Sequence, residues 1–234
     1  MNALIIMTRI PVAGRTKTRL IGKLTARQCA DIHKCFLLDI FNMCKRIDSN
    51  IHIYLSYGDE GNLNIINPII PEYIKCFPQE GRNIGEKMKN SIKKVLDLGY
   101  EKVTLIGSDI PEVQSQDIIK SFMVLDKKDI CFGPTLDGGY YLIAMKKLNK
   151  LVFENNIKWG KNSVFYNTMN ILNKEGLRVG FVDKHEDIDT KEDLDNLINR
   201  SMVNKAYYKE VPFNTIEFIN NWWVDENVKK YAEK

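Results

Sequence analysis

Short apolar, β-branched segments alternate with segments of helical period along most of this 234-residue chain. Strands that alternate with helices build a mostly parallel sheet with helices packed on both of its faces. The pattern therefore predicts a three-layer α/β/α, Rossmann-like fold around a mostly parallel mixed sheet. The expected strands are Ala3–Met7, Ile51–Ser56, Tyr73–Phe77, Lys102–Gly107, Asp129–Gly133, Tyr140–Met145 and Arg178–Val182.

The expected helices carry their own start and stop signals. Thr25 is placed to cap the first helix, with Gln28 at the capping-box position. The apolar stripe of this helix includes Ile32, Phe36, Ile40 and Met43. Later helices are expected over Ile84–Leu98, Gln116–Leu125, Asn162–Lys174 and Lys191–Asn199.

The length and composition fit one domain, because 44% of the residues are hydrophobic and no Gly/Ser/Pro-rich linker divides the chain. We expect this domain to span residues 1–200, with a helical extension over residues 201–234. The extension is rich in large aromatic residues, which mainly supply buried area. We expect it to pack on the main domain or on a second subunit, so a homodimer through the extension stays an open alternative.

Charge and cysteine usage exclude several classes of protein. The net charge of +4 is modest and both signs are dispersed, which does not indicate a nucleic-acid-binding protein. The apolar run at the N-terminus is only about five residues long, too short for a signal-peptide core or a membrane span. We therefore expect a cytoplasmic protein without a membrane span. Its cysteines are odd in number, form no close C-x-x-C pair and are expected to be reduced: Cys29, Cys35, Cys44, Cys76 and Cys131.

A basic loop follows the first expected strand and contains Arg9, Arg15, Lys17 and Arg19. In open α/β sheets ligands bind at the carboxyl ends of the strands, so cations there indicate an anion such as the phosphates of a nucleotide. Gly14 allows close approach of the loop backbone to a ligand. On this stretch alone, a solvated basic surface loop explains the charges equally well.

Asp109 follows the strand Lys102–Gly107 and is expected at the same edge of the sheet. A carboxylate beside a phosphate site is repulsive unless a divalent cation lies between them, and magnesium is commonly held by one or two carboxylates plus phosphate oxygens. Asp109 could instead begin a turn before Pro111.

Two further acidic segments are candidates for the same site. Asp137 precedes Gly138 and Gly139, which leave room for another molecule to approach, although Asp-Gly is also a strong hairpin signal. Asp187 and Asp189 precede a capping box of Thr190 and Asp193, and these paired acids could complete a divalent site begun by Asp109.

Other polar residues give weaker signals. Gly81 and Gly85 lie near the start of an expected helix, whose N-terminus could accept an anion or a base. The three histidines, His33, His52 and His185, share no metal-ligand spacing and are assigned no role beyond surface or core packing.

Taken in order, these motifs resemble a family of bacterial GT-A-like transferases, often labelled arsenosugar-biosynthesis glycosyltransferases. The family is related to MobA-like and 2-phospho-lactate guanylyltransferase nucleotidyltransferases. The resemblance spans roughly residues 3–198. The motifs that carry it are Pro11-x-x-Gly14-x-x-Lys17-Thr-Arg-Leu20, Gly85-Glu-Lys-Met88, Ile106-Gly-Ser-Asp-Ile-Pro111, Gly133-Pro-Thr-Leu-Asp-Gly-Gly-Tyr-Tyr-Leu-Ile143 and Asp187-Ile-Asp-Thr-Lys-Glu-Asp-Leu194.

The resemblance implies a nucleotide-diphospho-sugar transferase fold, with Asp109 and Asp189 as ligands of a divalent cation, Mg²⁺ or Mn²⁺. Asp137 would orient the donor sugar or the acceptor or act as a base, and Lys17 would share the catalytic role. This sequence departs from the family in having Arg9 in place of the usual lysine and Ala13 in place of proline. The residues expected to bind the nucleotide are Arg9, Gly14, Arg15, Lys17, Arg19, Gly85, Ser108, Gly138 and Gly139.

Three functions fit these residues. The first is a metal-dependent transfer of a sugar from a nucleotide-sugar donor to a small-molecule acceptor. The second is nucleotidyl transfer, in which a phosphorylated small molecule attacks a nucleoside triphosphate and pyrophosphate leaves. The third is a nucleotide-binding module without chemistry, which the retention of all candidate carboxylates disfavours. The base, the acceptor and the stereochemistry are not predicted, because fold and phosphate chemistry do not specify them.

Overall fold

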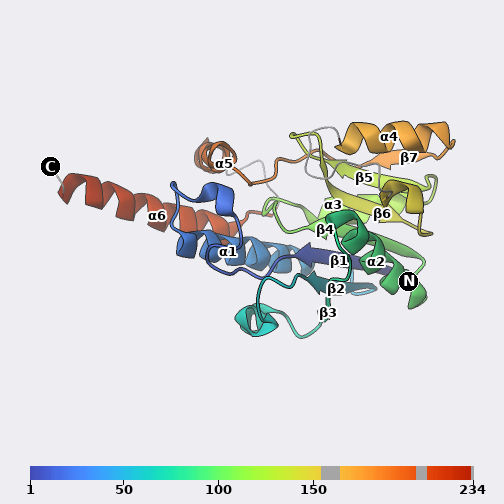
Figure 1. Cartoon of the computed structure of the whole chain (residues 1–234), viewed down its shortest axis with the longest axis horizontal. Coiled ribbons are helices and arrows are strands. Elements are labelled where there is room, and N and C mark those ends of the chain that lie inside the picture. Colours follow the sequence, from blue (N-terminus) through green and yellow to red (C-terminus); the bar gives the residue numbers. More distant parts are fainter. Residues whose placement is uncertain (154–163, 204–209, 233–234) are drawn as a thin grey trace.

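The structure, a computed structural model, describes residues 1–153, 164–203 and 210–232. Its centre is a seven-stranded sheet of strand order β3-β2-β1-β4-β6-β5-β7 (Figure 1). β6 is antiparallel to β4 and β5, and the other neighbouring strands are parallel. The strands are β1 (Asn2–Thr8), β2 (Ile51–Tyr57), β3 (Lys75–Pro78), β4 (Lys102–Gly107), β5 (Ile130–Pro134), β6 (Tyr140–Met145) and β7 (Val179–Phe181).

Helices cover both faces of this sheet, and alternate residues of each strand point to opposite faces. In β1, Leu4 and Ile6 pack with α1 and α3, whereas Ile5 and Met7 pack with α2, η4 and α4. The helices are η1 (Thr18–Leu20), α1 (Ala26–Cys44), η2 (Leu63–Ile65), η3 (Asn67–Ile69), α2 (Ile84–Asp97), α3 (Ser115–Val124), η4 (Lys150–Phe153), α4 (Val164–Lys174), α5 (Lys191–Val203) and α6 (Phe213–Ala232).

The predicted fold class is confirmed, and each predicted element within the described residues is present with ends shifted by at most a few residues. Thr25 and Gln28 form the predicted capping box of α1, and the predicted stripe of α1 is buried. The predicted start of α4 at Asn162 lies outside the described residues. Among the residues that are described, no helix has both the length and the apolar character of a transmembrane segment.

The sheet places three loops at one edge. β1 and β4 run in register, with Met7 opposite Gly107, so the basic loop and Asp109 leave the sheet side by side. Because β6 is antiparallel to both β4 and β5, the β5–β6 connection returns to this same edge. The loop that carries Asp137 therefore lies near the carboxyl end of β4.

The C-terminal extension packs on the main domain through α1. The carboxylate of Asp39 in α1 accepts hydrogen bonds from the backbone N–H groups of Asn214 and Thr215 at 2.9 Å each, which caps the start of α6. Ile219 of α6 is buried against Ile32 and Phe36 of α1. α6 runs alongside α1 and its far end projects beyond it (Figure 1). The extension thus packs on the main domain, but through Ile219 more than through its large aromatics, since Phe213 and Trp223 remain 65% and 47% exposed. A dimer contact stays a prediction.

The division of the chain at residue 200 also stays a prediction. α5 continues to Val203, so this helix runs across the expected boundary. Glu210 then joins the extension to α3, since its carboxylate accepts from the backbone N–H of Ser115 at 2.6 Å.

Candidate active site

The basic loop folds as a set of tight turns between β1 and η1. The backbone N–H groups of Arg15 and Thr16 both donate to the carbonyl of Val12, at 2.9 and 3.2 Å. Gly14 has a φ of 76°, in the left-handed region that favours glycine, and is exposed with open space around its Cα. The loop ends at Leu20, whose fully buried side chain anchors it to the domain.

His33 of α1 lies within hydrogen-bond distance of this loop. Its Nδ1 lies 2.5 Å from the Thr16 hydroxyl, and its Nε2 lies 3.2 Å from the hydroxyls of Thr8 and Ser108. Burial lowers the pKa of His33 to about 4, and the positive charges of Lys17 and Arg9 act in the same direction. His33 is therefore neutral at physiological pH and joins the basic loop to β1 and β4.

Ser108 belongs to the same buried network. Its side chain is buried, and its hydroxyl donates to the Thr8 hydroxyl at 2.9 Å. The contacts of its hydroxyl are thus internal to the protein, and a contact between Ser108 and a nucleotide stays a prediction.

The Lys17 side chain extends from the basic loop to both predicted metal ligands, Asp109 and Asp189. Its Nζ lies 2.6 Å from Asp109 Oδ1 and 3.0 Å from Asp189 Oδ1, and donates to the carbonyl of Ile188 at 2.7 Å. Burial alone would lower the pKa of Lys17, but the charges of Asp109 and Asp189 raise it above its ordinary value. Burial acts to raise the pKa of Asp109, but the charge of Lys17, its hydrogen bond and the weaker effects of other basic groups together outweigh burial, so that this pKa is lowered. The three groups form one charged unit.

Ile188 holds the acidic segment next to Asp109. Its backbone N–H donates to the carbonyl of Asp109 at 3.0 Å, and its side chain is fully buried in the same cluster as Leu20. The capping box predicted for α5 is present, with Asp193 accepting from the Thr190 N–H at 2.6 Å and its own N–H donating to the Thr190 hydroxyl at 3.2 Å. These contacts bring residues far apart in the sequence to one place.

Two more acidic residues of the predicted site are Asp137 and Asp187. Asp137 is exposed, and its Oδ1 accepts from the Thr135 hydroxyl at 2.5 Å and from the Gly139 N–H at 2.9 Å. Burial raises the pKa of Asp187 to about 7, with further contributions from the negative charges of Asp137, Asp189 and Asp109. Four carboxylates therefore share one electrostatic environment.

Gly138 and Gly139 shape the loop that presents Asp137. Gly138 has a φ of 87°, and its carbonyl accepts from the N–H of Phe165 at the start of α4, at 3.1 Å. A Cβ on Gly139 would lie 3.0 Å from the Thr135 hydroxyl oxygen. In the structure these glycines serve the tight turn, and their contact with a nucleotide stays a prediction.

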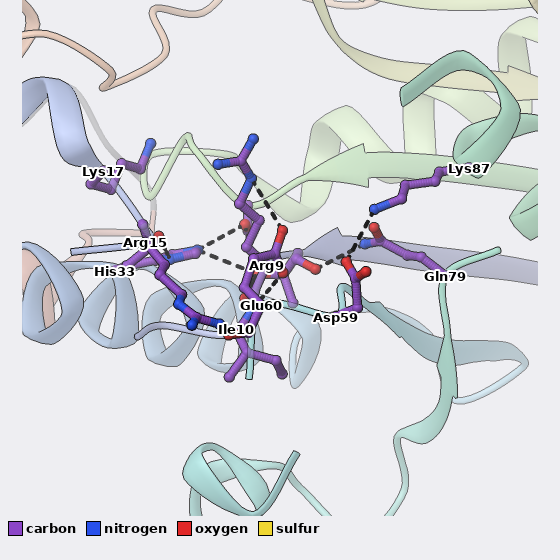
Figure 2. A network of polar contacts seen from close by, with 12 residues as sticks. Arg9, Ile10, Arg15, Lys17, His33, Asp59, Glu60, Gln79 and Lys87 are labelled. Atoms are coloured by element: carbon purple, nitrogen blue, oxygen red, sulfur yellow. Dashed lines mark hydrogen bonds and ion pairs between the residues drawn. The ribbon is translucent and has the colours of Figure 1, made fainter. Parts of the chain in front are cut away.

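Two arginines of the basic loop, Arg9 and Arg15, contact Glu60 in the loop after β2 (Figure 2). Arg9 Nε lies 3.5 Å from Glu60 Oε1, and Arg15 Nη1 donates to the backbone carbonyl of Glu60 at 3.0 Å. The N–H of Ile10 donates to Glu60 Oε2 at 3.4 Å. A Cβ at position 58 would lie 2.2 Å from Glu60 Oε2, so Gly58 leaves the space that this carboxylate fills.

Sequence reasoning missed Glu60 and the polar role of His33. Glu60 carried a usable signal, because it follows the second strand at the same edge as the basic loop. His33 carried none, because its hydroxyl partners come from three separate segments.

Arg19 and Gly85 lie apart from these contacts. Arg19 is exposed, and its nearest ion-pair atom is Asp189 Oδ2 at 4.0 Å. Gly85 is buried in the first turn of α2, where Asn83 caps the helix by accepting from the Glu86 N–H at 2.9 Å. The structure thus joins Lys17, Asp109 and Asp189 directly, places Arg19 beside them, and puts Gly85 on a separate helix.

The donor set at Asp109 and Asp189 fits a divalent cation. Both carboxylates already contact one cationic nitrogen, and their side chains remain 47% and 41% exposed. Mg²⁺ is bound by one or two carboxylates with the remaining ligands from water or phosphate. Within the described parts of the chain there is no group of three or more His, Cys, Asp or Glu side chains arranged to hold a metal ion. The fit therefore rests on two carboxylates with a phosphate ligand.

Residues 44–161 match the family described as "Uncharacterized protein conserved in bacteria (DUF2064)". The chain belongs to this family. A search of curated proteins finds no match to this sequence.

Solved structures agree with the fold. A "putative nucleotide-diphospho-sugar transferase" from Desulfovibrio desulfuricans G20 is 28% identical, with a TM-score of 0.83, and the match covers 98% of this chain and 97% of that one. CMP:2-keto-3-deoxy-manno-octonic acid synthetase complexed with CTP is 9% identical with a TM-score of 0.55, covering 86% of this chain and 98% of that one.

A third similar structure is 4-diphosphocytidyl-2C-methyl-D-erythritol synthase from Anaerococcus prevotii. It is 15% identical with a TM-score of 0.55, and the match covers 85% of this chain and 96% of that one. The two synthases support the fold alone. The similarity to the Desulfovibrio protein extends over nearly all of both chains.

Proposed function

We propose that this protein is a metal-dependent transferase that moves a sugar from a nucleotide-sugar donor to a small-molecule acceptor. The observation that carries the proposal is the meeting of the basic loop with Asp109 and Asp189 at the carboxyl edge of the sheet. In open α/β sheets this edge is where ligands bind. The 28% identity to a protein named as a nucleotide-diphospho-sugar transferase supports the same class.

Asp109 and Asp189 would hold the divalent cation. When bound there, the cation would neutralise the charge that develops on a departing diphosphate. Arg19, which is exposed beside Asp189, would balance further phosphate charge. Arg9 and Arg15 would do the same by exchanging Glu60 for phosphate oxygens.

Asp137 would act on the sugar or on the acceptor. One of its oxygens is fixed by Thr135 and Gly139, which orients the carboxylate. Its Oδ2 accepts no hydrogen bond from the residues that the structure describes. This oxygen is the one that would orient a hydroxyl or take its proton.

Nucleotidyl transfer is the second candidate. It is favoured by the resemblance of the Lys17-Thr-Arg-Leu20 run to that of 2-phospho-lactate guanylyltransferase. Both reactions need a divalent cation and a phosphate cradle at the same edge. They differ in what leaves, since sugar transfer releases a nucleoside diphosphate and nucleotidyl transfer releases pyrophosphate.

The test begins with a thermal-shift screen of nucleoside diphosphates, triphosphates and nucleotide sugars, with and without Mn²⁺. A ligand at a hundred times its Kd stabilises the fold by about 2.7 kcal/mol, which such a screen detects. The best ligand is then incubated with a bacterial small-molecule extract as the source of acceptors. Release of nucleoside diphosphate from a nucleotide sugar, absent with Asp109→Asn, is the expected result.

Release of pyrophosphate from a triphosphate would contradict sugar transfer and support nucleotidyl transfer. Equal product formation by the wild type and Asp109→Asn would contradict the role of Asp109 as a metal ligand in either reaction. Asp195→Asn is the matched control, because Asp195 is a half-exposed aspartate of α5 that bonds Lys23, away from the proposed metal ligands.

A further inference from the structure

The ammonium group of Lys17 is saturated by the protein itself. A lysine ammonium has three N–H donors and no acceptor. The structure supplies three oxygen partners, from Asp109, Asp189 and the Ile188 carbonyl, all within 3.0 Å. The side chain is only 3% exposed. In this state Lys17 has no N–H left for a phosphate oxygen.

The Lys17 ammonium also occupies the position between the two carboxylates that are proposed to bind a divalent cation. The atoms that contact it, Asp109 Oδ1 and Asp189 Oδ1, are oxygens of the two proposed metal ligands. Two cations a few ångströms apart repel each other strongly in a partly desolvated site. A divalent cation therefore binds both carboxylates only if the ammonium moves away from at least one of them.

The backbone of Lys17 is held in an unusual conformation. Its φ of 47° and ψ of 36° place it in the left-handed region, and it is the only non-glycine residue of the described chain with a positive φ. Such a conformation costs energy and persists only where the surroundings enforce it. Here the Thr16 hydroxyl bonds His33 on one side, and Leu20 is fully buried on the other. These contacts fix the backbone on either side of Lys17, so a change of partners at this site involves the Lys17 side chain.

We propose that Lys17 is an internal counter-cation that excludes a divalent ion from Asp109 and Asp189 until a phosphate ligand draws its ammonium away. This rests on the proposed function, because it assumes that these carboxylates bind the cation. Metal and phosphate then bind cooperatively, and each raises the affinity for the other by the same factor. Lys17 is a positioning residue in the ligand-free protein and becomes a phosphate ligand afterwards.

The experiment measures Mn²⁺ affinity by electron paramagnetic resonance of the free ion, with and without inorganic pyrophosphate. The wild type should bind Mn²⁺ weakly alone and at least tenfold more tightly with pyrophosphate. Lys17→Met should bind Mn²⁺ alone at least tenfold more tightly than the wild type, and pyrophosphate should add less. Lys17→Arg restores the positive charge and should return the affinity towards that of the wild type.

Arg19→Met is the matched control for net charge. Arg19 is near Asp189 at 4.0 Å but forms no ion pair with Asp109 in the structure. Its loss should change the affinity for Mn²⁺ alone less than threefold. A gain as large as that of Lys17→Met would overturn the proposal, since any nearby charge would then have the same effect. A Lys17→Met affinity equal to or below that of the wild type would also overturn it.

A second measurement on the wild type does not depend on the folding of Lys17→Met. In ¹⁵N-lysine NMR, the Lys17 ammonium should give a slowly exchanging signal that is absent from Lys17→Arg. Mg²⁺ together with pyrophosphate should shift this signal, and Mg²⁺ alone should not. No shift with both ligands bound would overturn the proposal.

The results also separate this proposal from the proposed function. Tight Mn²⁺ binding by the wild type without pyrophosphate would overturn the counter-cation role alone. A failure of wild type and Lys17→Met to bind Mn²⁺ even with pyrophosphate would overturn both.

Discussion

Both ends of the basic loop are positively charged, but one charge is exposed and the other is buried. At one end, Arg9 is 66% exposed and lies on the single carboxylate of Glu60. At the other end, Lys17 is buried between two carboxylates and a backbone carbonyl. Exposed ion pairs contribute about 0–1 kcal/mol, whereas breaking a buried pair costs about 3–5 kcal/mol. Arg9 can therefore exchange Glu60 for another anion at little cost. Lys17 instead holds Asp109 and Asp189 together.

The partners explain this difference. Glu60 comes from the loop beside the basic loop, at the end of β2. Asp109 and Asp189 come from the middle and the far end of the chain, and Ile188 holds them together from within a buried cluster that also contains Leu20 and Ile219. The C-terminal extension therefore contributes, through Ile219, to the buried cluster that holds Ile188 and Leu20.

The largest expected effect comes from the carboxylates at the lysine end. Asp109→Asn removes a charge that would hold the cation and that pairs with Lys17, and should lower the rate by about 10³-fold or more, since metal stabilisation is worth several kcal/mol. Steady-state rates of nucleotide product release measure it. The rate of Asp195→Asn should stay within about twofold of the wild-type rate, because surface substitutions away from a site have small effects. A rate loss of less than tenfold for Asp109→Asn would show that Asp109 does not hold a catalytic metal ion.

His33 supports the lysine end, and its effect should appear as a pH dependence. The folded-state pKa of about 4 lies below the ordinary value of 6.5, so the unfolded chain binds the proton first as the pH falls. Stability is therefore lost between about pH 6.5 and pH 4, by on the order of 3 kcal/mol. Urea unfolding at pH 7 and pH 4 should show a smaller loss for His33→Gln than for the wild type. Equal losses would mean that folding does not lower the pKa of His33.

A direct comparison of the two ends uses matched substitutions by methionine. Lys17→Met should lower the free energy of unfolding by about 2–3 kcal/mol, below the full value for a buried pair because both carboxylates remain half exposed. Arg9→Met should change it by less than about 1 kcal/mol. Denaturant titrations at one pH measure both. Equal changes would remove the distinction between the two ends.

The smallest effect is expected at Glu60. Glu60→Gln removes the negative charge that competes with phosphate for Arg9 and should raise the affinity for pyrophosphate by about threefold, which fits the small energy of an exposed pair. Isothermal titration calorimetry measures it. Asp59→Asn is the control, because Asp59 pairs with Lys87 at 3.5 Å instead. A tenfold loss of affinity in Glu60→Gln would show that Glu60 positions the arginine for phosphate.

The fold and part of the site follow from local sequence. Hydrophobic periodicity and capping residues predict where the helices and strands lie. The rule that ligands bind at the carboxyl edge of such a sheet then predicts that Arg19, Asp109 and Asp189 lie in one region. Asp109 lies just after the end of β4, Asp189 lies just before the cap of α5, and Arg19 lies in η1, after the loop that leaves β1. Local signals of this kind do not depend on the rest of the fold.

The remaining features depend on contacts between distant segments. Nothing near Lys17 in the sequence indicates that two carboxylates would saturate its ammonium, or that His33 would bond hydroxyls from three segments. Asp39 likewise caps α6 at Asn214 and Thr215 from the middle of α1. Tertiary packing decides such partners, so periodicity and propensity do not contain them.

The most direct test of the central claim is a crystal structure of the protein with Mn²⁺ and pyrophosphate, using the anomalous signal of manganese. The claim is that the basic loop and the acidic segments form one phosphate and metal site. We predict a manganese peak bonded to Asp109 and Asp189, with pyrophosphate between it and Arg19. A peak elsewhere, or pyrophosphate bound away from the basic loop with Lys17 still between the carboxylates, would contradict the claim.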